Sequence, residues 1–192
     1  MTLMEKNASK VDETIDAIRR MIPDFTRKEL HLNIGHESGH YFANVGYGGA
    51  SPHHAKVMAA VEHHRKANGA SLHPVHFLED RYQALIPKYY ETHKSPLPCS
   101  ALSSSCFVDA YWNLFACSIW DAKVGNLREN QFDLSALWNG DRRRELRQEV
   151  VEERCSHCWT PCEAYPTILG NLSKAALSVV DTQTAPVPLK TV

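Results

Sequence analysis

The sequence Arg154-Cys155-Ser156-His157-Cys158-Trp159-Thr160-Pro161-Cys162-Glu163 places three thiols within eight residues. A reduced, packed core does not need cysteines at this density. Two residues separate the first two of these cysteines, a spacing that lets one turn direct two sulfurs at one metal centre. The remaining cysteines of the chain lie upstream around a predicted hairpin: Cys99, Cys106 and Cys117.

The composition indicates the compartment in which these thiols work. The net charge is -1 with a pI near 6.8, so no electrostatic field attracts nucleic acid or an anionic membrane surface. No apolar run approaches the roughly 18 to 20 residues of a membrane span, and Met1 to Lys6 lack a signal-peptide core. We therefore expect a cytoplasmic protein with no nucleic-acid or membrane partner. Cytosolic thiols are kept reduced, which favours metal ligation or redox chemistry over structural disulfides.

The first half of the chain alternates predicted strands and helices. Apolar residues at helical spacing predict helices over 9–22, from Ser51-Pro52 to 69, and over 77–92, the last one broken or kinked by Pro87. Alternation predicts a strand over 30–34, and 72–75 is a shorter candidate strand. This order predicts parallel β/α units of an α/β fold, although two or three units are too few to close a barrel.

The character of the sequence changes after Ser95-Pro96-Leu97-Pro98. Two short strands within 106–109 and 114–119 predict a β-hairpin, and 125–127 predict a turn. A short helix around 134–138 and an amphipathic helix over 141–154 then lead to Cys155. Residues beyond 171 show no periodicity and are expected to form a loose tail.

The residues alone leave the bound metal open. Cys99 and Cys117 can join Cys155 and Cys158 in a four-thiolate site, with Cys162 as a substitute or additional ligand. Cys106 is expected to be a packed thiol. Four thiolates suit zinc and an iron-sulfur cluster equally well.

Residues 99–170 resemble the C-terminal auxiliary-cluster region of radical SAM enzymes, the SPASM domain or its shortened relative, the twitch domain. The resemblance rests on Cys99-Ser100-Ala101-Leu102, Phe107 to Cys117, Val124 to Arg128, Leu137-Trp138 and Cys155-Ser156-His157-Cys158. In that family one cysteine precedes a hairpin, a glycine occupies its turn, a second cysteine follows, and a Cys-x-x-Cys pair ends the motif. Trp112 stands here where the glycine is usual, which alters the turn and removes no ligand.

The resemblance implies a fold, a cofactor and a partner. It implies that 1–95 form the last β/α units of a partial (β/α) barrel, that 96–171 form a small α+β cysteine-rich domain with a hairpin and a helix, and that 172–192 are a tail. The implied cofactor is one auxiliary 4Fe–4S cluster for electron transfer or substrate contact. Its implied ligands are Cys99, Cys117, Cys155 and Cys158, with Cys162 in reserve.

The family's Cys-x-x-x-Cys-x-x-Cys triplet, which holds the cluster that cleaves S-adenosylmethionine, does not occur in this sequence. The resemblance therefore implies the C-terminal part of a radical SAM oxidoreductase, from a truncated or split reading frame and inactive by itself. S-adenosylmethionine would bind only if a separate N-terminal core polypeptide supplied that triplet. The substrate class stays open between peptides and small molecules.

Two other hypotheses compete with this interpretation. One is a structural zinc module that binds a partner protein, and the other is a vestigial product without metal. The histidines offer a weaker metal hypothesis, since Gly35 and Gly39 argue against a helix that would place His36 and His40 on one face. If the barrel prediction holds, those histidines follow a strand's C-terminal end, where barrel active sites collect.

Overall fold

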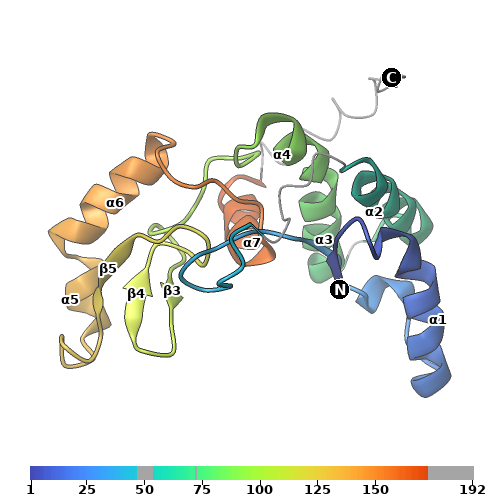
Figure 1. Cartoon of the computed structure of the whole chain (residues 1–192), viewed down its shortest axis with the longest axis horizontal. Helices are drawn as coiled ribbons and strands as arrows, with labels where there is room; N and C mark the ends of the chain where they lie inside the picture. Colours follow the sequence, from blue (N-terminus) through green and yellow to red (C-terminus); the bar gives the residue numbers. More distant parts are fainter. Residues whose placement is uncertain (47–53, 72, 173–192) are drawn as a thin grey trace.

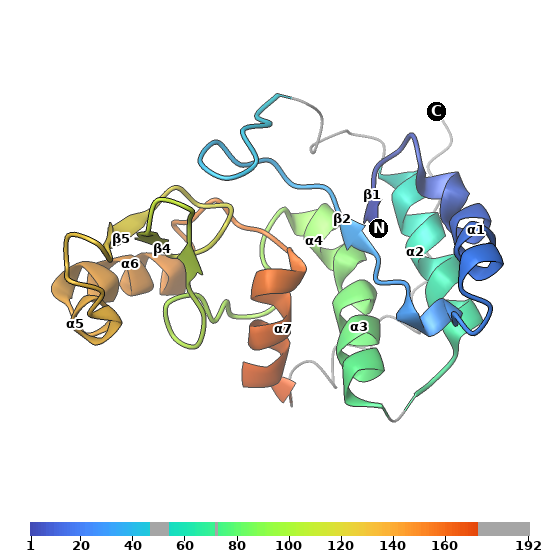
Figure 2. The same ribbon diagram turned by 90° about the horizontal axis from the view of Figure 1, so that it is seen from below.

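The computed structural model describes residues 1–46, 54–71 and 73–172. The helices α1 and α2 lie at one end of the molecule, and the sheet β3–β5 with helices α5 and α6 lies at the other (Figures 1 and 2). Helices α3, α4 and α7 lie between these ends. None of the helices within the described ranges has the length and apolar composition needed to cross a membrane.

The N-terminal region forms one parallel β-α-β unit. Strand β1 (Thr2–Leu3) pairs in parallel with β2 (Asn33–Ile34), and helix α1 (Val11–Met21) connects them, preceded by the 3-10 turn η1 (Ala8–Lys10) and followed by η2 (Arg27–Glu29). The parallel pairing agrees with the predicted β/α order, although β1 was not predicted and β2 is shorter than 30–34. The partial barrel itself stays a prediction.

Three helices complete the first half: α2 (Ala55–Asn68), α3 (Pro74–Ala84) and α4 (Ile86–Thr92). The predicted break is confirmed, because α3 ends before Leu85 and Pro87 occupies the first turn of α4, where its missing N–H costs nothing. The candidate strand 72–75 is wrong for the part described, because His73 caps α3 and Pro74 begins it. Its Leu72, and the predicted start of the second helix at 51–53, lie outside the described residues, as does the predicted tail from 173 onward.

The second half contains an antiparallel sheet of β3 (Phe107–Val108), β4 (Asn113–Phe115) and β5 (Lys123–Asn126). The predicted hairpin is confirmed with shorter strands. The turn predicted at 125–127 is wrong in part, because Gly125 and Asn126 pair with β4. Trp112 has a positive φ of 67°, so the turn keeps the left-handed conformation that glycine would adopt most easily.

Helices α5 (Leu134–Trp138) and α6 (Asp141–Val151) confirm the two predicted helices, the second ending before the predicted residue 154. Helix α7 (Pro161–Gly170) was not predicted, because its two prolines lower the helix propensity of this segment. Pro161 begins the helix and Pro166 lies inside it. Through Ala164 and Ile168, α7 joins the main core of the first half, together with buried Trp159.

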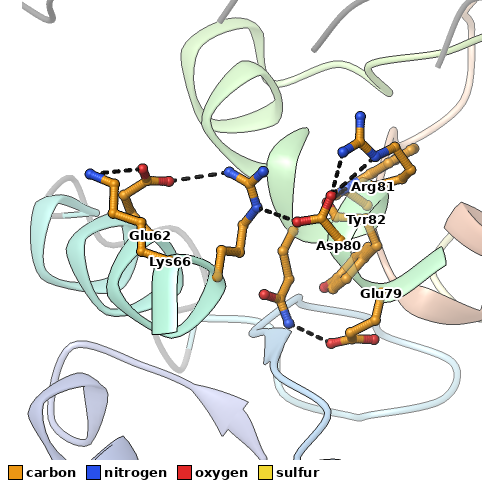
Figure 3. A network of polar contacts seen from close by, with 9 residues as sticks. Glu62, Lys66, Glu79, Asp80, Arg81 and Tyr82 are labelled. Carbon is orange, nitrogen blue, oxygen red and sulfur yellow. Dashed lines mark hydrogen bonds and ion pairs between the residues drawn. The ribbon is translucent and has the colours of Figure 1, made fainter. Parts of the chain in front are cut away.

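A buried carboxylate connects three separate segments. Glu79 of α3 accepts hydrogen bonds from the Leu32 backbone N–H (3.1 Å), from Gln83 Nε2 (2.6 Å) and from the Tyr165 hydroxyl of α7, and its Oε2 lies 3.1 Å from His31 Nδ1. Figure 3 shows Glu79 beside the partly buried polar network that joins α2 to α3, where Arg65 Nε lies 3.2 Å from Asp80 Oδ1. The burial of Glu79 is offset by these donors.

We expect Glu79→Ala to lower the free energy of unfolding by about 3 kcal/mol, because it leaves several buried donors without an acceptor. The matched control is Glu62→Ala, whose exposed ion pairs are worth at most about 1 kcal/mol. Urea denaturation at pH 7.5 measures both changes. Equal effects of the two substitutions would contradict the structural role of Glu79.

His64 of α2 has no exposed surface. Burial, assisted by the charge of Arg27, lowers its pKa to about 4 from an ordinary value of 6.5. The unfolded chain therefore takes up this proton at a higher pH than the folded chain, and stability falls as pH falls through this window. We expect wild type to lose about 2.5 kcal/mol more than His64→Leu between pH 7.5 and 4.5. Urea titrations at both pH values test this, and parallel losses would refute it.

Candidate metal centre

Four of the six cysteines line a single pocket in the second half of the chain. Cys99 follows the linker after α4, Cys117 lies between β4 and β5, and Cys155 and Cys158 lie between α6 and α7. These are the four ligands that the resemblance implies. The pocket wall is otherwise largely apolar, with Ala116, Ile119, Trp120 and Val150 among its lining residues.

Neighbouring helices fix the segment that carries Cys99. Arg147 Nη1 of α6 donates to the carbonyl oxygens of Cys99 (2.7 Å) and Ala101 (2.9 Å), and the Thr167 hydroxyl of α7 accepts from the Ser100 N–H (3.0 Å). The sequence reasoning did not single out Arg147. Its spacing on α6 indicated only a solvated basic face.

Backbone N–H groups point at all four pocket sulfurs. Cys99 Sγ accepts from the Ala101 N–H (3.4 Å) and Cys117 Sγ from the Trp120 N–H (3.3 Å). The backbone N–H of His157 faces the Cys155 sulfur and that of Thr160 faces the Cys158 sulfur, and each donor opposes the larger causes that raise the pKa of its thiol: burial for Cys155, and the hydrogen bond with Cys117 and burial for Cys158. Such donors stabilise a thiolate, which is the form of cysteine that binds metal.

Burial opposes these donors when no metal is bound. It raises the pKa of the Cys99 thiol to about 11 and raises the pKa of Cys155. Cys117 and Cys158 form a hydrogen bond to each other, which lowers the pKa of Cys117 and raises that of Cys158. A cation in this pocket would replace the protons, so binding should release protons and weaken at low pH.

The other two cysteines do not line this pocket. Cys162, in the first turn of α7, is exposed. Cys106 is partly buried and packs against the smaller core around Leu102 and Leu114, as expected for a packed thiol. The ligand assignment, including Cys162 as reserve, stays a prediction.

Within residues 1–46, 54–71 and 73–172, no group of three or more His, Cys, Asp or Glu side chains is close enough to hold a single metal ion. A tetrahedral zinc site with Zn–S bonds of about 2.3 Å requires sulfurs about 3.8 Å apart. A four-iron cluster has a different requirement, since each thiolate binds its own iron. Four cysteine thiols in one pocket are the donor set that such a cluster requires, so the donor chemistry of the pocket fits a thiolate-bound cluster.

The histidine loop after β2 reaches this site without offering it a ligand. His36 and His40 do not lie in the pocket wall. His36 instead accepts a hydrogen bond from the backbone N–H of Trp159, the residue after Cys158. Ser38 donates a hydrogen bond to the backbone carbonyl of Ser118, the residue after Cys117. No local pattern predicts these long-range hydrogen bonds, because the loop is separated from both cysteines by about eighty residues or more.

Comparison with known protein families agrees with this geometry. Residues 99–159 match the family model of SPASM, an iron-sulfur cluster-binding domain. The match begins at the first pocket cysteine and ends one residue after the last. No curated protein and no solved structure matches the chain. The second half of this protein therefore contains a SPASM-type iron-sulfur cluster-binding domain.

Proposed function

We propose that the protein binds one auxiliary 4Fe–4S cluster through Cys99, Cys117, Cys155 and Cys158 and that this cluster transfers electrons in a radical SAM oxidoreductase. The observation that carries the proposal is the single pocket lined by four cysteines from three separate segments, all within the SPASM match. Cys162 lies outside the pocket and would be a substitute ligand only.

A bound cluster would supply one-electron chemistry. The chain's own residues would hold and insulate it: four thiolates as ligands, backbone N–H groups that hydrogen-bond the sulfurs, and the side chains of Ile119, Trp120 and Val150 as a largely apolar wall. Four protein ligands leave no iron open for substrate. This favours electron transfer over substrate contact.

The proposal includes a partner. It is a radical SAM core that carries the Cys-x-x-x-Cys-x-x-Cys motif not found in residues 1–192, and this core would bind S-adenosylmethionine and start the chemistry. The parallel β1–β2 pair supports the related proposal that the first half corresponds to the last β/α units of a partial barrel. The substrate would be a peptide or a small molecule that the partner helps to select.

Anaerobic purification of the full chain, followed by iron, sulfide and zinc analysis and an absorption spectrum, tests the proposal. We expect about four irons and four sulfides per chain and a broad thiolate-to-iron band near ~400 nm. One zinc per chain with no colour would instead identify a structural zinc module. A chain without metal after anaerobic reconstitution with iron and sulfide would overturn both.

A further inference from the structure

The loop 35–46, which we call the β2 loop, runs from the end of β2 to the sheet β3–β5 (Figure 1). Two of its aromatic rings pack on that sheet: His40 on Phe115 with ring centroids 4.6 Å apart, and Tyr41 on Phe107 at 4.7 Å. Asn44 braces the loop internally, because it accepts from the Ser38 N–H and donates to the His36 carbonyl, both at 2.9 Å. The loop therefore has a defined shape against the cysteine-rich half.

Ser38 bonds to the segment that carries Cys117. Its side chain is buried, and its hydroxyl donates to the Ser118 carbonyl oxygen (2.9 Å). The Ser38 hydroxyl oxygen also accepts from the Tyr41 N–H (3.2 Å) and lies 3.2 Å from His40 Nδ1. A hydroxyl has one donor and two acceptor sites. Since Ser118 takes the one proton, the other two contacts fill the acceptor sites.

His36 bonds to the segment that carries Cys158. Its Nε2 accepts from the Trp159 backbone N–H (2.9 Å), so Nδ1 carries the proton and donates to the Ile34 carbonyl oxygen of β2 (3.1 Å). The ring packs against Tyr89 of α4, with centroids 5.3 Å apart. Both ring nitrogens are thereby committed to backbone partners, one in each half of the molecule.

The hydrogen bonds of Ser38 and His36 occupy equivalent positions relative to the pocket cysteines. Each one ends on the residue that directly follows a buried pocket cysteine, and those cysteines, Cys117 and Cys158, are hydrogen-bonded to each other. Sequence-distant side chains of one loop thus fix both backbone segments of the cysteine pair. Outer partners of this kind set ligand orientation and cluster potential.

We propose that His36 and Ser38 are positioning residues of the cluster site, which clamp the segments after Cys158 and Cys117 and so set the potential and retention of the cluster. This inference rests on the proposed function, since it concerns the same four-cysteine site. It also assigns the β2 loop as the connection through which the first half of the chain acts on the cluster.

The test uses full-length Ser38→Ala and His36→Phe, which remove the hydroxyl or the ring nitrogens and keep most of the volume. Ser71→Ala and His31→Phe are matched controls. Ser71 contacts His76 and His31 contacts Glu79, and neither touches a cysteine segment. Redox titration of the reconstituted proteins gives the first readout.

We expect the equilibrium constant for cluster reduction to change about three- to tenfold in each loop variant, the upper value being about 59 mV for a one-electron couple. Iron loss to a chelator should be about tenfold faster. Both controls should stay within about twofold of wild type in each measurement. Loop variants that match the controls in potential and in iron loss overturn the proposal.

A second readout needs no cluster. In the metal-free chain, iodoacetamide alkylation followed by peptide mass analysis measures each thiol separately. The clamp predicts at least a threefold faster reaction of Cys117 and Cys158 in the loop variants, with Cys106 unchanged. An equal increase at all cysteines would indicate general loosening and reject the clamp. If wild type takes up no iron and sulfide, the proposed function fails, and this readout still decides whether the loop positions the cysteine segments.

Discussion

Substitution of Cys158 by alanine is expected to reduce the iron content of the reconstituted protein from about four to below one per chain and to remove the absorption near ~400 nm. Cys158 and its partner Cys117 are the two buried thiols of the pocket, and Cys158 directly precedes Trp159, which is buried in the main core. Exposed Cys162 cannot reach the same place without movement of α7, which packs into the core through Ala164 and Ile168.

The matched controls are Cys106→Ala and Cys162→Ala. Neither residue lines the pocket, so the iron content, sulfide content and absorbance of both variants should differ from those of wild type by no more than about 10%. Full iron content in Cys158→Ala would show that the ligand assignment is wrong. Loss of iron in Cys162→Ala, with Cys158→Ala still loaded, would make Cys162 the fourth ligand.

Trp159→Ala should lower the free energy of unfolding by about 4 kcal/mol, the typical cost of truncating a buried Trp to Ala. Trp159 is 1% exposed and packs in the core shared by the two halves. Its indole Nε1–H donates to the Tyr82 carbonyl oxygen (2.9 Å), and the two rings stack with centroids 6.1 Å apart. The substitution therefore creates a cavity and removes one of the two hydrogen bonds to the Tyr82 carbonyl oxygen, which keeps the bond from the Leu85 backbone N–H.

Urea denaturation of the metal-free protein measures this effect without a contribution from metal binding. Tyr111→Ala is the control, because Tyr111 is 77% exposed in the turn between β3 and β4 and should change stability by less than about 0.5 kcal/mol. A small effect of Trp159→Ala would mean that the cysteine-rich half is not anchored on the first half through this side chain.

Much of the local secondary structure of the chain could be predicted from its sequence. Apolar spacing predicted α1 and α6, and Pro87 predicted the break between α3 and α4, because helix periodicity and proline geometry are properties of neighbouring residues. The strand β1 was missed because strand formation there depends on pairing with a sequence-distant segment. Thr2 and Leu3 become a strand only because Asn33 and Ile34 lie beside them, and two residues carry too little pattern to predict this.

Proline explains a different omission. Pro161 and Pro166 lower the helix propensity of residues 161–170. The helix α7 nevertheless forms and buries Ala164, Thr167 and Ile168. Tertiary packing of that face outweighs the lost backbone hydrogen bond.

The sequence by itself determined the thiol chemistry of this protein: six cysteines, a Cys-x-x-Cys pair and the hairpin motif that resembles the SPASM family. Only the tertiary structure decided which thiols meet in one pocket, that Cys162 lies outside it, and that His36 and Ser38 reach the backbone beside Cys158 and Cys117. The physical reason is the sequence separation of the interacting residues. Ligand type and turn spacing are local, whereas a hydrogen bond between a loop and a residue 80 or 123 positions away exists only after the core has packed.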